Sequence, residues 1–112
     1  MIAHVVLLKP RPDLSPLERE AFLDAFERAV RDIPDVRGVR VGARVTHNAG
    51  YEQGMPPADF LAVMDFDDLA GLQSYLSHPA HQELGTLFGR FLTSALVYDF
   101  EVGDAGLLRR FV

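Results

Sequence analysis

The sequence contains no cysteine among its 112 residues. Disulfide bonds, thiol nucleophiles and thiolate metal sites are therefore excluded, and the redox compartment stays open. Long hydrophobic runs are also absent, because the apolar segment 5–8 is too short for a membrane span and no basic leader precedes it. We therefore expect no signal peptide and no membrane partner, and we take the cytoplasm as the location.

Positive charge is scarce as well. The chain has 11 Lys and Arg residues against 16 Asp and Glu residues, a formal net charge of −5, and its basic residues form no run. Contacts with phosphate need clustered Lys and Arg, so the sequence argues against a nucleic-acid partner. We find no Gly-rich phosphate loop, Ser-His-Asp arrangement or paired-carboxylate motif. The 48% content of hydrophobic residues is that of an ordinary globular domain.

Four segments have the composition and periodicity of β-strands. Residues 2–9 are rich in β-branched side chains, and their apolar groups on both faces indicate that both faces are covered. Residues 36–46 alternate between apolar and polar side chains, which predicts a strand with one polar face. Residues 60–66 and 95–102 complete the set. The intervening segment 47–57 has two glycines and two prolines and is predicted to be a loop.

Two regions have helical periodicity. The first begins at Ser15, which can cap the helix and form a capping box with Glu18, and it should end before Pro34. The second begins at Asp67 or Asp68 and is broken around Pro79, which disfavours helical geometry at His78 and can open a second helical run. The element order is then β-α-β-β-α-β. It predicts an α+β, ferredoxin-like fold with one four-stranded antiparallel sheet and the helices on one face.

The second face of this sheet also carries apolar side chains and needs a cover. Covering about 500 Å² on each of two chains gives a gross gain of ~25 kcal/mol at roughly 25 cal/mol per Å². The entropic cost of association is about 4–15 kcal/mol, so pairing should win. We therefore predict a homodimer whose two sheets face each other and enclose a barrel.

Groups that exchange protons near neutral pH gather at the break between the helical runs. The segment 75–81 holds one of the three tyrosines and two of the four histidines. His81 lies near the N-terminus of the run opened by Pro79, where the partial positive charge favours a neutral imidazole that can act as a base. Tyr75 can donate a hydrogen bond to a carbonyl that becomes an enolate. The alternatives are a structural His at the helix end and a core aromatic.

The other candidates are less specific. His78 is a candidate for substrate binding, although capping the break is the better interpretation. His4 is either a satisfied core histidine or a ligand-orienting group that points into the barrel lumen. His78 and His81 have a spacing that can share one metal ion, but the proline interrupts the helix and no third ligand is evident, so we expect no metal. Gly85 and Gly89 suggest close helix packing.

Four segments together resemble the stress-responsive dimeric α/β barrel (Dabb) family over residues 1–102. They are the opening IAHVVLLK at 2–9, the pattern P-x-V-x-x-V-x-V-G at 34–42, the junction Y-x-x-H-P-x-H at 75–81 and the closing LVYDF at 96–100. The resemblance implies a homodimer of ferredoxin-like sheets. One plant member is a polyketide cyclase that promotes an intramolecular aldol condensation without a cofactor. Its catalytic Tyr and His fall on Tyr75 and His81, and the His of its first strand falls on His4.

Three departures from that plant enzyme affect the expected substrate. Phe60 stands where the enzyme has a further His, the loop at 47–58 is longer, and a tail follows at 103–112. The preferred interpretation is a cofactor-independent enzyme acting by proton transfer on a small hydrophobic carbonyl compound. The alternatives are a non-catalytic dimer that binds a small hydrophobic ligand or protects other proteins under stress, and oxygen chemistry of the small-monooxygenase kind.

Overall fold

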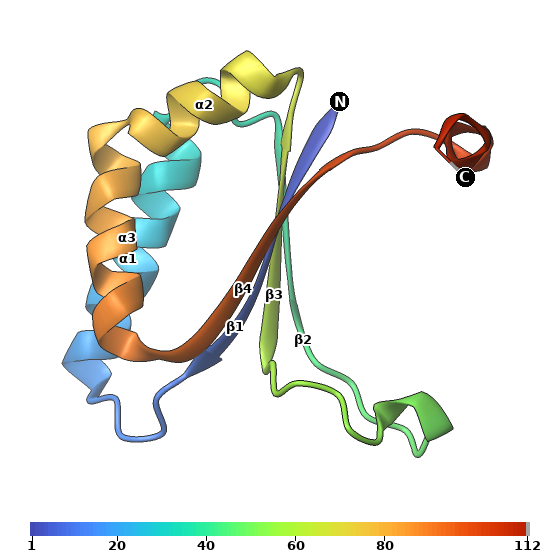
Figure 1. The fold of residues 1–112 in the computed structure, drawn as a ribbon. Coiled ribbons are helices and arrows are strands. Elements are labelled where there is room, and N and C mark those ends of the chain that lie inside the picture. Colours follow the sequence, from blue (N-terminus) through green and yellow to red (C-terminus); the bar gives the residue numbers. More distant parts are fainter. Residues whose placement is uncertain (112) are drawn as a thin grey trace.

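The computed structural model describes residues 1–111 and shows a four-stranded antiparallel sheet with three helices on one face (Figure 1). The strand order β2-β3-β1-β4 places β1 and β3 in the centre. The elements are β1 Ile2–Pro10, α1 Pro16–Asp32, β2 Gly38–Ala43, η1 Gly50–Glu52, β3 Phe60–Phe66, α2 Leu69–Ser77, α3 Pro79–Phe91, β4 Leu92–Glu101 and η2 Ala105–Arg110. This order confirms the predicted α+β, ferredoxin-like fold. No helix within residues 1–111 is long and apolar enough to cross a membrane.

Local signals set the ends of α1. The Ser15 hydroxyl accepts a hydrogen bond from the Glu18 backbone N–H at 3.1 Å, and the Glu18 carboxylate accepts one from the Ser15 N–H at 3.1 Å. This is the predicted capping box, which satisfies two amides that have no partner inside the helix. The helix ends at Asp32, and Ile33 before Pro34 is extended, with φ −92° and ψ 110°.

The break between α2 and α3 also follows the sequence. The Asp68 side chain caps α2 by accepting from the Gly71 N–H at 2.9 Å. His78 is extended, with φ −69° and ψ 140°, and Pro79 occupies the first position of α3. Three strands have bounds that differ from the prediction. The strand β1 extends to Pro10 instead of 9, β2 covers only 38–43 of the expected 36–46, and β4 covers 92–101 instead of 95–102.

The core lies between the sheet and the helices. Successive side chains of a strand point to opposite faces, and on β1 and β3 the even-numbered residues face the helices. Val6, Met64 and Phe66 are each at most 2% exposed and pack against Ala29 of α1 and Leu72 of α2. This layer holds the helices on the sheet and fixes the position of every group that they carry.

Some helical residues do not have the predicted role. Leu17, whose helical spacing predicts a place on the apolar face of α1, lies in the first turn of the helix and is 82% exposed. Gly85 and Gly89 do not mark a close packing of α3, since a methyl group built on either one meets nothing within 4 Å. The prediction of close helix packing at these glycines is therefore wrong.

The sheet face opposite the helices has no cover within residues 1–111. We call it the open face, and it is formed by Ala3, Val5, Leu7, Leu61, Val63, Asp65, Leu96, Tyr98 and Phe100 together with Arg40 and Gly42 of β2. Most of these side chains are apolar, and Tyr98 and Phe100 are each 51% exposed. An apolar area of this kind usually marks an interaction site in a soluble protein.

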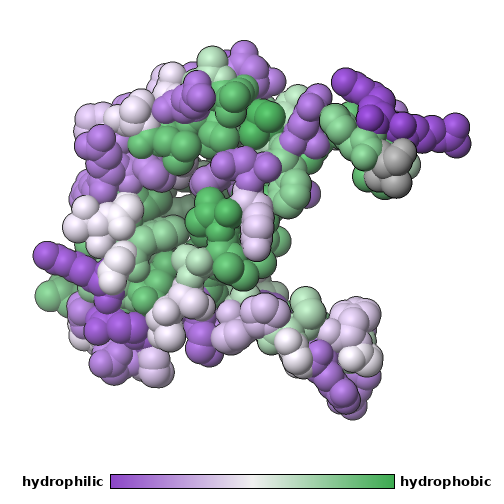
Figure 2. Space-filling model, viewed as in Figure 1, coloured by the Kyte–Doolittle hydropathy of each residue, from purple (hydrophilic) through white to green (hydrophobic). Residues whose placement is uncertain are grey.

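Two segments project beyond the sheet on the side of the open face (Figure 1). One is the loop arm, residues 44–59, which joins β2 to β3 and contains η1. The other is the tail, residues 103–111, which follows β4 and contains η2. The loop arm and the tail leave opposite ends of the sheet, so the molecule has a C-shaped outline in the space-filling view (Figure 2).

Candidate active site

Tyr75 lies at the centre of a cluster of rings between the sheet and the helices. Its side chain is only 1% exposed and comes from α2. Ring centroids lie 4.7 Å away for His81 of α3, 5.8 Å for His4 of β1 and 5.2 Å for Phe66 of β3. The structure therefore brings together three of the four predicted site residues, from three different elements.

The hydrogen bond of His81 defines which ring nitrogen is free. Its Nδ1 lies 3.1 Å from the Leu76 carbonyl oxygen, which can only accept, so Nδ1 carries the proton and donates it. Nε2 is then left with a lone pair when the imidazole is neutral. Burial lowers the pKa of His81, the nearby His4 adds to this effect, and the Leu76 carbonyl opposes it. The predicted neutral state therefore follows chiefly from desolvation, whereas the sequence argument used the helix terminus.

Tyr75 keeps its proton. Burial raises the pKa of its phenol to about 12, so at neutral pH the hydroxyl is a hydrogen-bond donor. The Tyr75 side chain is 1% exposed and makes no hydrogen bond within residues 1–111, so the phenol proton is not committed to another group of the chain.

His4 is held by a residue that sequence reasoning missed. Its Nδ1 lies 2.6 Å from Oδ1 of Asp99, which is directly opposite on β4. A carboxylate accepts, so Nδ1 donates and Nε2 is the free nitrogen. Asp99 is the one charged residue in the segment 95–100, which is otherwise apolar, and this contrast could have indicated a special role for it. It could be interpreted only with the register of β4 against β1.

The position of His4 corrects one expectation. His4 lies on the helix-covered face, in ring contact with Tyr75, and is 4% exposed. A lumen between two sheets would be lined by the open face, so His4 does not point into it. The physical reason is the pleat: His4 shares the parity of Val6, which packs in the core beneath the helices.

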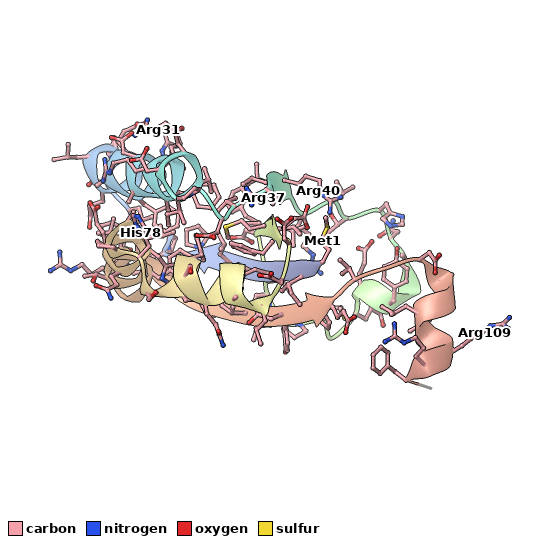
Figure 3. All side chains as sticks on the ribbon, turned by 90° about the horizontal axis from the view of Figure 1, so that it is seen from above. Met1, Arg31, Arg37, Arg40, His78 and Arg109 are labelled. Carbon is pink, nitrogen blue, oxygen red and sulfur yellow. The ribbon has the colours of Figure 1, made fainter. Side chains whose placement is uncertain are left out.

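His78 is not among the rings that contact Tyr75. Its Nδ1 accepts a hydrogen bond from the Ala80 N–H at 3.0 Å and so caps α3. It lies toward the end of α1 (Figure 3). No group of three or more His, Asp or Glu side chains within residues 1–111 could hold a metal ion.

His47 belongs to a small cluster in the loop arm. Its Nε2 lies 3.1 Å from the Tyr51 hydroxyl, and the Glu52 carboxylate accepts hydrogen bonds from the His47 and Ala49 N–H groups. These bonds lower the pKa of Glu52 and organise η1. His47 is therefore separate from the ring cluster.

The cluster combines a neutral imidazole with a free lone pair, a protonated phenol, and a second imidazole fixed by a carboxylate. Such a set can take a proton from carbon and stabilise the oxyanion that forms, without a metal. It lies in a ferredoxin-like α+β domain in which α2 supplies Tyr75, α3 supplies His81 and the central strand β1 supplies His4.

The chain belongs to the stress-responsive A/B barrel domain family, whose sequence profile matches residues 2–102. It is 25% identical over 99 residues to olivetolic acid cyclase from Cannabis sativa, covering 88% of this chain and 94% of that protein. The tail, residues 103–111, lies entirely beyond the residues that the family profile matches.

Solved structures show the same fold. A protein from Arabidopsis thaliana has a TM-score of 0.76 at 24% identity and covers 94% of this chain and 98% of that one. A hydroxynitrile lyase from Passiflora edulis has a TM-score of 0.78 at 12% identity and covers 93% and 94%. A dimeric ferredoxin-like protein of unknown function from Thermobifida fusca has a TM-score of 0.69 at 24% identity and covers 90% of each chain.

Proposed function

We propose that this protein is a cofactor-independent enzyme that acts by proton transfer on a small hydrophobic carbonyl compound. The observation that carries the proposal is the contact between the Tyr75 and His81 rings, whose centroids lie 4.7 Å apart. Burial raises the pKa of the phenol and lowers the pKa of the imidazole, and both shifts are in the direction that the reaction needs. The similarity to olivetolic acid cyclase supports the same class of substrate.

In the proposed reaction, His81 Nε2 removes a proton from the carbon next to the substrate carbonyl. The C–H bond breaks, its electron pair moves toward the carbonyl oxygen, and an enolate forms. The Tyr75 hydroxyl donates a hydrogen bond to that oxygen and stabilises the charge that develops there. The enolate carbon then attacks a second carbonyl carbon of the same molecule, whose C=O π electrons move to its oxygen, and that oxygen takes the proton back from the imidazolium of His81. Alternatively, the enolate carbon is itself protonated again by that imidazolium. No electron acceptor or metal is needed.

His4 is proposed to orient the substrate. The Asp99 carboxylate fixes the ring through Nδ1 at 2.6 Å, so Nε2 has one defined direction. The substrate-binding role predicted for His78 is the weakest of the four assignments, because its Nδ1 already caps α3. Its Nε2 and the edge of its ring are what remain for a ligand.

We further propose that the chain forms a homodimer through the open face. The face is apolar and has no cover within residues 1–111, and Tyr98 and Phe100 are half exposed at its surface. Related structures from Thermobifida fusca and Bacteroides fragilis are described as dimeric ferredoxin-like proteins. The ring cluster lies on the other side of each sheet, so every subunit of this dimer carries its own site.

The experiment is hydrogen–deuterium exchange at carbon. A panel of small hydrophobic ketones and 1,3-dicarbonyl compounds is incubated with the protein in D₂O, and loss of the α-proton signal is followed by NMR. We expect catalysed exchange with at least one compound, and a loss of about 10²-fold or more in His81→Ala, which lacks the base. Tyr75→Phe should lose about tenfold or more, since it lacks the donor.

His47→Ala is the matched control, because it removes an imidazole outside the cluster and should leave exchange unchanged. Exchange that survives His81→Ala within a few-fold would refute the assignment of the base. Tight binding of a compound with no exchange across the panel would favour the non-catalytic ligand-binding alternative. Oxygen uptake with quinol-like compounds would favour oxygen chemistry.

A further inference from the structure

We propose that in the dimer the tail of each subunit docks into an apolar recess beside the loop arm of its partner. The occupant of the recess is thus a second copy of this chain. The inference rests on the proposed sheet-to-sheet dimer and adds to it the segment that lies beyond the family match at residue 102.

The tail has local order but no contact that buries its largest side chains. The Asp104 carboxylate caps η2 by accepting from the Gly106 N–H at 2.9 Å, and the Leu107 side chain packs against Gly103. In spite of this order, Leu108 is 65% exposed and Phe111 is 66% exposed. A short helix that holds a Leu and a Phe away from its own domain presents them to another surface.

The recess lies on the open face at the end where the loop arm departs. It has a volume of about 490 Å³, and its walls come from the sheet and from the arm. Its lining is mainly apolar and includes Leu7, Leu61, Leu96, Tyr98, Met55 and Pro56. Filling it with a Leu and a Phe removes apolar surface from water on both partners.

The tail cannot fill the recess of its own chain. The loop arm and the tail leave opposite ends of the sheet, and the tail extends away from the body of the molecule (Figures 1 and 3). A two-fold axis that runs parallel to the sheet and across its strands turns one copy end over end. With the open faces opposed, this rotation brings each tail to the loop arm of the partner, and the symmetry fills both recesses.

Charge favours the same pairing. The tail has Arg109 and Arg110 against one acidic residue, whereas the loop arm has Glu52 and Asp59 against Arg44. The tail is thus locally positive in a chain with a net charge of −5, and it meets an arm with an excess of one acidic side chain. A tail-to-tail contact would instead place four Arg side chains together.

The absence of native cysteine allows a direct test by disulfide trapping. One variant carries Leu108→Cys in the tail, and a second carries Met55→Cys in the loop arm. The two proteins are mixed, allowed to exchange subunits and oxidised. We expect a disulfide-linked dimer that joins one Leu108→Cys chain to one Met55→Cys chain, seen on a non-reducing gel. The control replaces Met55→Cys with Leu17→Cys on α1, which is more accessible (82% against 56% exposed) and should still give no such pair.

The outcomes separate this inference from the dimer itself. Sedimentation that shows a dimer, together with failure of the Leu108–Met55 pair to cross-link above the control, would overturn tail docking and leave the dimer standing. A cross-link confined to two Leu108→Cys chains would also overturn it. A purely monomeric protein would overturn both. As a second measurement, Phe111→Asp should weaken the dimer by about tenfold or more, whereas Arg109→Ala should weaken it less.

Discussion

The two faces of the sheet are built from the same strands, yet they differ in chemistry. On β1, His4 faces the helices and pairs with Asp99, while its neighbour Val5 faces outward between Val63 and Tyr98. The helix-covered face combines polar, titratable groups with tight apolar packing, and the open face is mostly apolar, with exposed fractions from 6% at Ala3 to 51% at Tyr98 and Phe100. The period of two along a strand therefore separates the proposed chemistry from the proposed assembly within a single sheet.

The largest expected effect of the difference between the two faces is on the free energy of unfolding, and two tyrosines test it. Tyr75→Ala removes a ring that is 1% exposed, and the loss of packing should lower the free energy of unfolding by roughly 3–5 kcal/mol. Tyr98→Ala removes a ring that is 51% exposed, so unfolding of the single chain should change little. Denaturant titration at low concentration, where subunits are separate, measures both.

The reverse ranking is expected for association. Tyr98→Ala should raise the dissociation constant of the dimer by about tenfold or more, and Tyr75→Phe should leave it unchanged, as measured by analytical ultracentrifugation. Equal effects of Tyr75→Ala and Tyr98→Ala on unfolding would show that the two faces are not distinct layers.

The helix-covered face should also dominate the response to pH. Burial raises the pKa of Tyr75 from 10.0 to about 12, so the phenol loses its proton at a lower pH in the unfolded chain than in the folded one. Its contribution to stability is complete below pH 10 and is lost as the pH rises toward 12, by up to about a hundredfold in the folding equilibrium.

His81 acts at the other end of the pH range. Its pKa is lowered below 6.5, chiefly by burial, so the unfolded chain binds a proton more readily and stability falls as the pH drops below 6.5. Proton exchange on the substrate should persist below pH 6.5 and disappear only when His81 is protonated. Thermal unfolding and exchange rates between pH 4 and 11.5 test both limbs, and Tyr75→Phe should remove the alkaline one.

Asp99 offers a smaller effect on the same face. Asp99→Asn leaves His4 without its anionic partner, and we expect the catalysed exchange rate to fall by about tenfold. Because Asp99 acts through His4, kcat should change more than KM. Asp65→Asn is the matched control, because Asp65 lies beside β1, as Asp99 does, but on the open face. This variant should change the exchange rate by no more than about twofold. A similar loss in both variants would indicate a general defect in the sheet.

Sequence reasoning succeeded where the signal is local. The capping box at Ser15 and the break at Pro79 depend on residues that are close in the sequence, and both are found in the structure. It did not find Asp99, because the contact with His4 depends on the register of strands 95 residues apart. It also left open which face His4 occupies. Residues 2–9 are apolar on both faces, so their pattern does not show whether the odd-numbered or the even-numbered residues face the helices. The direction of the tail depends on tertiary placement that no periodicity encodes.

The smallest expected effect lies outside both faces. Ser15→Ala removes the hydroxyl that accepts from the Glu18 N–H at 3.1 Å and should cost about 1 kcal/mol of unfolding free energy. Because α1 covers the helix face but carries none of the clustered rings, substrate exchange and dimer affinity should both stay unchanged. Ser15→Asp, which can also accept at the cap, should restore most of the loss. If Ser15→Ala slowed exchange as much as Asp99→Asn, the ring cluster would depend on the position of α1 as a whole.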